Sequence, residues 1–201
     1  MLDVPLLIGG QSCPARDGRT FERRNPVTGE LVSRVAAATL EDADAAVAAA
    51  QQAFPAWAAL APNERRSRLL KAAEQLQARS AEFIEAAGET GAMANWYAFN
   101  VRLAANMLRE AASMTTQING EVIPSDVPGS FAMALRQPCG VVLGIAPWNA
   151  PVILATRAIA QVWKNGYAVE RAQPKAGATA IPVGEALPAD LARSLSAVAG
   201  G

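Results

Sequence analysis

The sequence contains no histidine among its 201 residues. Histidine is the side chain most often used as a general base at neutral pH and the most common metal ligand, so its absence argues against a Ser-His-Asp hydrolase and a zinc site of the usual kind. Cysteine is almost as scarce, because only Cys13 and Cys139 occur and neither belongs to a metal-binding or redox motif. We therefore expect no metal ion, and this cysteine usage suits a reducing compartment.

An excess of charge and long apolar runs are also missing. The 18 basic residues balance the 18 acidic residues, so the net charge does not indicate nucleic acid or an anionic membrane as a partner. The basic cluster Arg65, Arg66 and Arg68 has no interleaved aromatic residues, and we expect it to point toward solvent. No apolar run approaches the roughly 20 residues that cross a bilayer, and the first residues lack a basic region before an apolar one. These features predict a soluble cytoplasmic protein.

Residues 140–151, Gly-Val-Val-Leu-Gly-Ile-Ala-Pro-Trp-Asn-Ala-Pro, form the most informative stretch that is present. The apolar run over residues 141–146 predicts a strand buried on both faces, and the proline at 151 suits the first position of a following helix. The sheet of a nucleotide-binding α/β fold begins in this way. Such folds bind ligands past the carboxyl ends of their strands, which places Pro147, Trp148 and Asn149 where chemistry would occur.

Upstream of this stretch the patterns predict a β-rich opening followed by helices. Residues 6–38 contain two or three short strands around turns, with Cys13 in a loop. Thr39 and Asp42 form a variant of the capping box at the start of the first helix. We expect Pro55 to end that helix, because proline lacks the backbone N–H that a helix interior requires.

Later elements are predicted by capping residues and periodicity. Pro62 begins a second helix and Ser80 caps a third. A long helix over residues 93–116 has the length of a spine against which the sheet packs. Apolar residues alternate over residues 131–135, a pattern typical of a half-buried strand. The weaker patterns of the tail predict a short strand, a helix and a last strand at residues 166–169, 182–194 and 196–201.

Several short motifs follow one another along residues 1–160 and together carry a family resemblance. They are Asn25-Pro26-Val27-Thr28-Gly29-Glu30, Phe54-Pro55-Ala56-Trp57, Glu89-Thr90-Gly91, Ile123-Pro124-Ser125, Arg136-Gln137-Pro138-Cys139-Gly140-Val141-Val142 and Pro147-Trp148-Asn149. The last motif is the most specific. The chain resembles the amino-terminal part of the NAD(P)-dependent aldehyde dehydrogenase superfamily, and within it the branch that acts on aromatic aldehydes such as salicylaldehyde, vanillin or benzaldehyde.

The resemblance implies an α/β fold that contains the beginning of a Rossmann-like parallel sheet, N-terminal β-hairpin elements and several packed helices, truncated relative to the family. It also implies a chemistry. A cysteine thiolate attacks the aldehyde, hydride passes to the nicotinamide of NAD or NADP, and a water activated by a glutamate cleaves the thioester. Asn149 matches the family's oxyanion-stabilising asparagine.

The same resemblance assigns the cofactor-binding residues. The stretch that lines the cofactor groove is matched by Ile145, Ala146, Pro147 and Trp148. For Trp148 the alternative is a core aromatic residue that closes the end of the strand, and its neighbours Pro147 and Asn149 favour the groove. Arg171 lies in the neighbourhood of the family's lysine, which binds the adenosine ribose. The sequence does not specify NAD over NADP.

Two further residues are candidates for contact with an aromatic aldehyde. In this branch, the position of Trp96 on the long helix faces the aldehyde tunnel, where an indole can stack on an aromatic ring. The alternative for Trp96 is a spine residue buried against the sheet. Arg157 follows the Asn149 loop in an otherwise apolar run, where its guanidinium can pair with a phenolate or an ortho hydroxyl group. The alternative for Arg157 is an arginine that extends its charge to the surface.

Other family features are absent from these residues. The nucleophilic cysteine and the glutamate base of the family lie beyond position 201, and Cys139 stands at the opposite end of the strand from the substrate. The glycine-rich turn under the pyrophosphate is also missing, so cofactor binding by this fragment alone is not expected. We divide the chain into residues 1–160, which end with the first strand and helix of the NAD(P)-binding domain, and residues 161–201, a diverged or frameshifted remainder of that domain. The catalytic domain is absent.

These features favour a fragment of an aldehyde dehydrogenase that has no catalytic activity by itself. A second hypothesis is a non-catalytic interaction module that associates with a full-length relative, since the family oligomerises. As partners we therefore expect other copies or relatives of this chain, in a homo- or hetero-oligomer. A third is that the fragment folds poorly, because an apolar sheet edge is left exposed.

Overall fold

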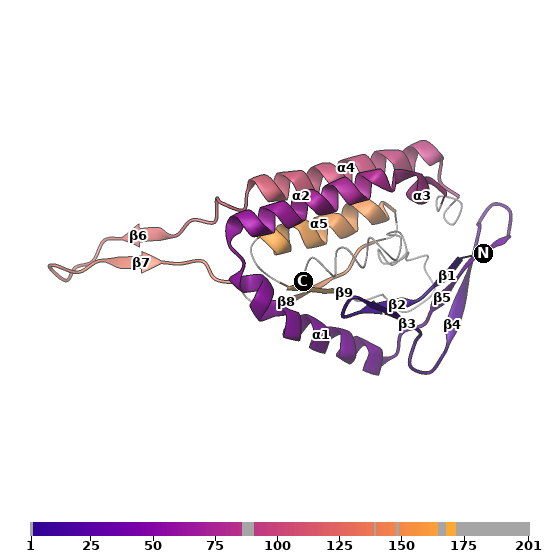
Figure 1. Ribbon diagram of the computed structural model, residues 1–201, viewed down its shortest axis with the longest axis horizontal. Helices are drawn as coiled ribbons and strands as arrows, with labels where there is room; N and C mark the ends of the chain where they lie inside the picture. Colours follow the sequence, from indigo (N-terminus) through magenta and orange to yellow (C-terminus); the bar gives the residue numbers. More distant parts are fainter. Residues whose placement is uncertain (1, 86–90, 139, 148, 165–167, 172–201) are drawn as a thin grey trace.

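The computed structural model describes residues 2–85, 91–138, 140–147, 149–164 and 168–171. Figure 1 shows a helical layer, a small β region beside the amino terminus and a long two-stranded arm that projects from the body. The predicted α/β class with N-terminal hairpin elements and packed helices is confirmed. The predicted elements at 182–194 and 196–201 lie outside the described residues.

The amino-terminal β region holds more strands than the two or three expected over residues 6–38. Strands β2 (Leu6–Ile8) and β3 (Gln11–Cys13) form a hairpin. Its turn has positive φ angles at both Gly9 (57°) and Gly10 (77°), as a two-residue hairpin turn of type I′ requires. A second sheet has the order β1-β5-β4, with β1 at Leu2–Val4, β4 at Thr20–Arg24 and β5 at Leu31–Ala36. Cys13 therefore ends a strand and does not lie in a loop, because the two-glycine turn brings β3 back alongside β2.

Helix α1 (Leu40–Ala59) begins at the predicted capping box. The Thr39 hydroxyl oxygen accepts from the Asp42 N–H at 3.2 Å, and the Asp42 carboxylate accepts from the Thr39 N–H at 2.8 Å. The prediction that Pro55 ends this helix is wrong, since the helix continues through Pro55 to Ala59. A proline costs the helix one hydrogen bond, but the turn that follows places Trp57, which is 1% exposed, in the core. Burial of an indole offsets that loss.

Helices α2 (Pro62–Ala78), α3 (Ser80–Glu85), α4 (Ala94–Ser113) and α5 (Pro151–Lys164) form the main core together. The long helix α4 packs chiefly against α2, α5 and α3, so the prediction that it packs against the sheet is wrong. The reason is its buried face, which is rich in small residues that let helices approach closely. This face consists of Tyr97, Asn100, Val101, Ala104, Ala105, Leu108, Ala111 and Ala112.

The first turn of α2 also departs from the prediction. Arg65 was expected to point toward solvent but is only 8% exposed. Its guanidinium donates a hydrogen bond to the carbonyl oxygen of Leu60, the residue that ends α1. The last carbonyl groups of a helix have no partner within the helix, so a buried arginine can supply one. Burial lowers the pKa of Arg65 from its usual value.

The arm consists of β6 (Glu121–Ile123) and β7 (Ala132–Ala134), which pair antiparallel from Glu121↔Ala134 to Ile123↔Ala132. Every residue of both strands is exposed, so the half-buried strand predicted over residues 131–135 is wrong. The alternating pattern correctly indicates a strand, but the ribbon extends away from the body, which therefore covers neither face (Figure 1).

Strands β8 (Val141–Gly144) and β9 (Ala168–Arg171) pair in parallel, with α5 between them in the chain. The pair is in contact with α5 and α1, and this unit is the predicted beginning of a parallel sheet. Burial of β8 on both faces was predicted wrongly, since Leu143 is 56% exposed. In the described part of the chain β8 pairs only with β9, so the parallel sheet consists of two strands there.

None of the helices among the described residues is long and apolar enough to span a bilayer.

Candidate active site

The candidate site is the loop between β8 and α5. Side chains alternate along it, because Gly144 and Ala150 are buried whereas Ile145, Pro147 and Asn149 are exposed. Ala146 is half-buried and packs against the helical core. Gly144, Ala146 and Ala150 therefore anchor the loop, and Ile145, Pro147 and Asn149 face outward. Trp148 lies outside the described residues.

Asn149 occupies the point where the loop enters α5. It lies two residues before Pro151, the first residue of that 14-residue helix, and Ala150 accepts the hydrogen bond from the Leu154 N–H at 2.9 Å. The first N–H groups of a helix have no internal partner, and the helix dipole makes this end attractive to negative charge. The neutral amide of Asn149 adds a hydrogen-bond donor there that does not titrate. This arrangement can stabilise a developing anion without exchanging protons.

Strand register brings the position of Arg171 to the same edge as this loop. Gly144, the last residue of β8, is paired with Arg171, the last residue of β9. The carboxyl ends of the two parallel strands therefore coincide, which is where α/β sheets bind their ligands. The structure thus brings Arg171 and residues 145–147 together, although they are far apart in the sequence.

The two predicted substrate residues lie on neighbouring helices. Trp96 is on α4 and Arg157 is on α5, and the two helices pack against each other. Trp96 is 41% exposed, so it is not buried against a sheet. Its ring stacks on Phe99, with the centroids 5.6 Å apart and an angle of 24° between the planes. Arg157 is exposed.

Phe99 and its neighbour Arg102 were missed in the sequence. The Arg102 guanidinium carbon lies 5.8 Å from the centre of the Phe99 ring. The signal that could have revealed this arrangement is the spacing of three residues from Trp96 to Phe99 and again to Arg102, which places all three along one side of a helix.

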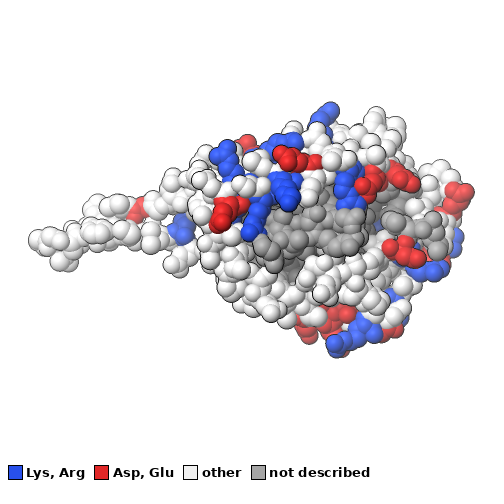
Figure 2. All heavy atoms as spheres, viewed as in Figure 1, with Lys and Arg blue, Asp and Glu red and all other residues white. Residues whose placement is uncertain are grey.

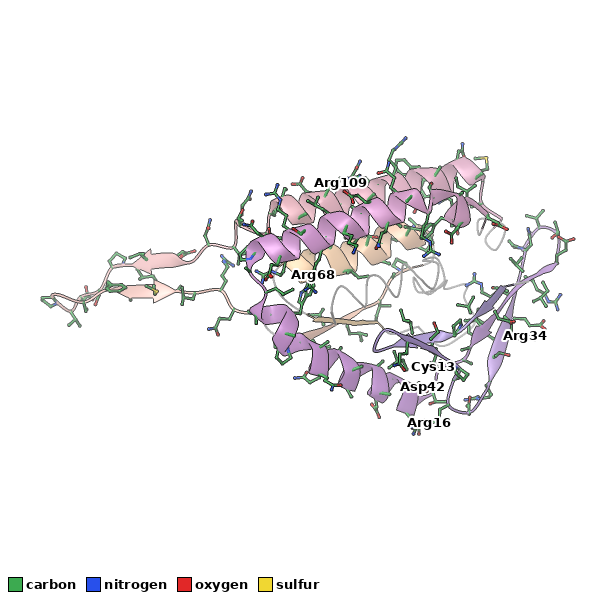
Figure 3. The ribbon with its side chains drawn as sticks, in the orientation of Figure 1. Cys13, Arg16, Arg34, Asp42, Arg68 and Arg109 are labelled. Atoms are coloured by element: carbon green, nitrogen blue, oxygen red, sulfur yellow. The ribbon has the colours of Figure 1, made fainter. Side chains whose placement is uncertain are left out.

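Cys13 is not suited to be the nucleophile. Burial, and secondarily the charge of Asp42, raises the pKa of its thiol, whereas a nucleophilic cysteine requires a lowered pKa. Figure 3 shows Cys13 near Asp42 and Arg16, where the amino-terminal β region meets the start of α1. Cys139 lies outside the described residues. The described part of the chain contains no group of three or more acidic, cysteine or histidine side chains placed to hold a metal ion.

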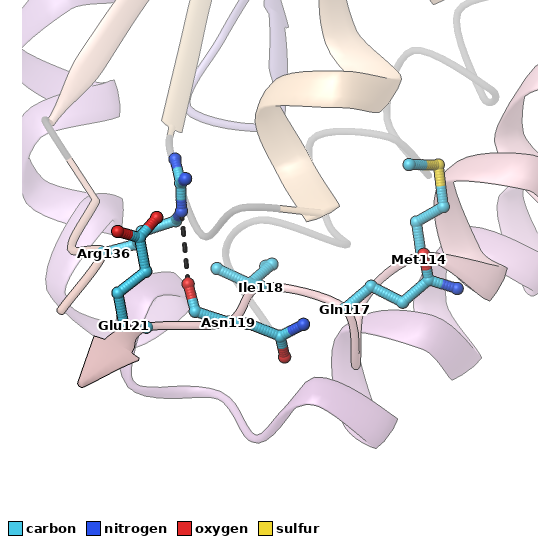
Figure 4. A pocket seen from close by; sticks show the side chains of 7 residues that line it. Met114, Gln117, Ile118, Asn119, Glu121 and Arg136 are labelled. Atoms are coloured by element: carbon cyan, nitrogen blue, oxygen red, sulfur yellow. Dashed lines mark hydrogen bonds between the residues drawn. The ribbon is translucent and has the colours of Figure 1, made fainter. Parts of the chain in front are cut away.

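The base of the arm contains a hollow that the sequence did not reveal. Its volume is about 390 Å³, and its lining includes Met114 at the end of α4 and Glu121 and Arg136 on the arm (Figure 4). The Arg136 Nε donates to the carbonyl oxygen of Asn119 at 3.2 Å. This contact closes the base of the ribbon, and the hollow is lined by residues that join the arm to the body.

Comparison with known proteins gives consistent matches. Residues 14–187 match the aldehyde dehydrogenase family. A vanillin dehydrogenase from Pseudomonas fluorescens is 98% identical over 169 residues, which are 84% of this chain and 35% of that protein. The chain thus spans about a third of the length of the curated relatives it matches.

Solved structures agree over most of the chain. The crystal structure of a salicylaldehyde dehydrogenase from Pseudomonas putida G7, complexed with salicylaldehyde, has a TM-score of 0.87 at 38% identity and covers 98% of this chain and 40% of that one. The structure of PnpE in complex with nicotinamide adenine dinucleotide has a TM-score of 0.79 at 35% identity and covers 83% of this chain and 34% of that one.

Proposed function

This chain belongs to the aldehyde dehydrogenase family, and we propose that it forms the amino-terminal third of an enzyme that oxidises an aromatic aldehyde to its carboxylic acid with NAD⁺ or NADP⁺. The balanced reaction consumes the aldehyde, the oxidised cofactor and water, and releases the acid, the reduced cofactor and a proton. The observation that carries this proposal is the exposed Asn149 amide between the end of β8 and the amino terminus of α5.

The loop after β8 fits one side of a dinucleotide groove. Ile145 is 62% exposed and Pro147 is also exposed, so an apolar surface lies at the edge where β8 and β9 end. A flat nicotinamide ring can pack against such a surface. When bound, NAD or NADP supplies the hydride acceptor. Residues 145–148 and Arg171 would hold it.

We propose that Asn149 acts on the aldehyde, the second reactant besides the cofactor. When a thiolate adds to the aldehyde carbon, the carbonyl oxygen becomes negatively charged, and we assign the Asn149 amide the role of donating a hydrogen bond to it. Because the amide is neutral and lies at the start of α5, it can stabilise this charge without transferring a proton.

Trp96 and Arg157 serve the substrate end of the proposed site. The exposed indole offers a flat apolar face to the aldehyde's aromatic ring. The exposed guanidinium offers paired donors to a phenolate or an ortho hydroxyl group. This division of roles predicts that Arg157→Ala raises KM more for hydroxylated benzaldehydes than for benzaldehyde.

The nucleophile is not assigned to this chain. Cys13 is half-buried at the end of β3, against the small core cluster of the amino-terminal β region, and its raised pKa does not favour a thiolate. We propose that the nucleophilic cysteine and the general base are supplied by residues outside these 201. The isolated chain is therefore expected not to transfer hydride from vanillin or salicylaldehyde to NAD⁺ or NADP⁺. Turnover by the isolated chain would contradict this assignment.

The test of the oxyanion role uses the whole protein that carries this chain. Asn149→Ala is expected to lower kcat by about 10²- to 10³-fold, as loss of a comparable oxyanion donor does. The matched control is Asn106→Ala, an exposed asparagine on α4, which should leave kcat unchanged. Equal kcat values for the two variants would remove Asn149 from the mechanism.

A second candidate function is association through the arm. Six apolar residues on or beside its strands are between 45% and 77% exposed, namely Val122, Ile123, Val127, Phe131, Met133 and Leu135. Figure 2 shows the arm mostly free of charged side chains, while the body carries both signs. Large exposed apolar patches mark protein–protein contacts, and we propose that the arm binds a second copy or a full-length relative.

The association is tested by light scattering after size-exclusion chromatography. Met133→Lys places a charge on the arm and is expected to reduce the measured mass to that of a single chain. Val27→Lys changes an apolar residue that is 80% exposed in the turn between β4 and β5, and this control should leave the mass unchanged. A mass that is the same for both variants would exclude the arm as the interface.

A further inference from the structure

One side of α4 carries three stacked side chains. The Trp96 and Phe99 rings have their centroids 5.6 Å apart, and the Arg102 guanidinium carbon lies 5.8 Å from the centre of the Phe99 ring. Trp96 is three residues before Phe99 and Arg102 is three residues after it, so consecutive helical turns supply the indole, the phenyl ring and the cation. Each contact falls within the range of aromatic or cation–π attraction.

The backbone beneath this stack is also fixed. The side-chain amide of Asn100 donates to the carbonyl oxygen of Trp96 at 2.8 Å, and Asn100 is only 1% exposed. The Trp96 N–H donates to the carbonyl oxygen of Met93 at 3.0 Å. Trp96 is therefore held at its backbone by a buried amide, while its ring remains 41% exposed.

An exposed tryptophan on a helix normally exchanges between several rotamers, and fixing it during binding costs conformational entropy. Stacking on Phe99 restricts the indole before any ligand arrives. Arg102 restricts Phe99 in turn, because the cation is attracted to the face of that ring. A contact surface that is ordered in advance binds more tightly than a mobile one of equal area.

We propose that Phe99 is a positioning residue for aromatic aldehydes, which holds the Trp96 indole in the orientation that receives the substrate ring, with Arg102 holding Phe99. This inference rests on the proposed function of Trp96 as a substrate contact. The ligand class is a planar benzaldehyde-type ring. Phe99 acts through Trp96 and takes no part in the bond changes, so its loss should raise KM and leave kcat largely unchanged.

The test compares Phe99→Leu with Phe21→Leu in the whole enzyme. The two phenylalanines have almost the same exposure, 38% and 40%, but Phe21 lies in β4. Phe99→Leu is expected to raise KM for vanillin by about 3- to 10-fold, the range that corresponds to one aromatic pair. Phe21→Leu should not change KM. Phe99→Tyr keeps a six-membered aromatic ring and should restore most of the parent value.

A double-mutant cycle with Trp96→Leu separates the inference from the function on which it rests. If Phe99 acts through the indole, Phe99→Leu should have no further effect on KM once Trp96 is leucine. An equal rise in KM with and without Trp96 would overturn the positioning role while leaving the role of Trp96 intact. If Trp96→Leu alone does not change KM, the proposed substrate contact fails and this inference fails with it.

A spectroscopic measurement tests the stack without any substrate. The near-ultraviolet circular dichroism of Trp96, obtained as the difference between the parent and Trp96→Leu, should weaken in Phe99→Leu because the indole loses its fixed orientation. Arg102→Gln should weaken it less. An unchanged indole signal in Phe99→Leu would show that Phe99 does not order Trp96, and would overturn the inference.

Discussion

The helical body and the β6–β7 arm use apolar residues in opposite ways. In the body, small residues such as Ala104 and Ala111 are fully buried and allow α4 to pack closely against its neighbouring helices. In the arm, large residues such as Val122 and Phe131 are 77% and 71% exposed. Size and hydrophobicity therefore do not decide burial in this chain, whereas placement in the fold does. The body should carry the stability and the arm should carry association.

The strongest test of this contrast is a substitution that creates a cavity in the helical body and so lowers its stability. Leu69 on α2 is completely buried in the helical core, and Leu69→Ala should lower the free energy of unfolding by about 2–5 kcal/mol. The matched control is Leu40→Ala at the start of α1, where the side chain is 77% exposed and the expected change is within about 0.5 kcal/mol. Urea unfolding monitored by circular dichroism measures both. Similar changes for the two variants would mean that the helices do not form one cooperative core.

A smaller loss of folding stability is expected when Asp42, which lies where the β region meets α1, is substituted. The Asp42 carboxylate accepts from the Thr39 N–H at 2.8 Å and from the Arg16 N–H at 3.1 Å, and so joins the start of α1 to the loop after β3. Asp42→Ala should lower the free energy of unfolding by about 1 kcal/mol, as loss of a helix cap does. Asp44→Ala, on an exposed position of the same helix, serves as the control and should have less effect in the same urea titration.

The contribution of Asp42 should also depend on pH. The hydrogen bond from the Thr39 backbone, followed by the one from Arg16, holds the pKa of Asp42 below its usual value despite its burial. A lowered pKa in the folded state means that the contribution is fully present above the unfolded value of about 4 and is lost as the pH falls through the folded value. Asp42→Asn should flatten the stability profile in this acidic range. A parent profile that is already flat there would contradict the assignment.

Local chemistry explains which features could be predicted from the sequence. The Thr39–Asp42 capping box, the helix starts at Pro62 and Pro151, and the strand–loop–helix order around Asn149 each depend on a few adjacent residues, and the structure contains them. The β8–β9 register pairs Arg171 with Gly144. This register joins residues that are far apart in the sequence, so adjacent residues do not predict it, and only the structure reveals it.

The wrong predictions share a different cause. The burial of Arg65 depends on where the preceding helix ends, and the exposure of residues 131–135 depends on the distance of the arm from the body. Likewise, helix α1 continues past Pro55 because Trp57 reaches a core built by other helices. Tertiary context decided each of these three cases. The Trp96–Phe99 stack differs, because it depends only on a spacing of three residues within α4.

The smallest effect on stability should come from removing the arm. Glu121 and Ala134 are paired across the ribbon, so residues 122–133 can be replaced by Asn-Gly, a sequence that favours the two-residue turn of a hairpin. The replaced residues that belong to strands are all exposed, and we expect the free energy of unfolding to change by no more than about 1 kcal/mol. The mass measured by light scattering should fall to that of a single chain, because the apolar surface has been removed. A loss of stability as large as that of Leu69→Ala would show that the arm supports the body, and the contrast between the two regions would no longer hold.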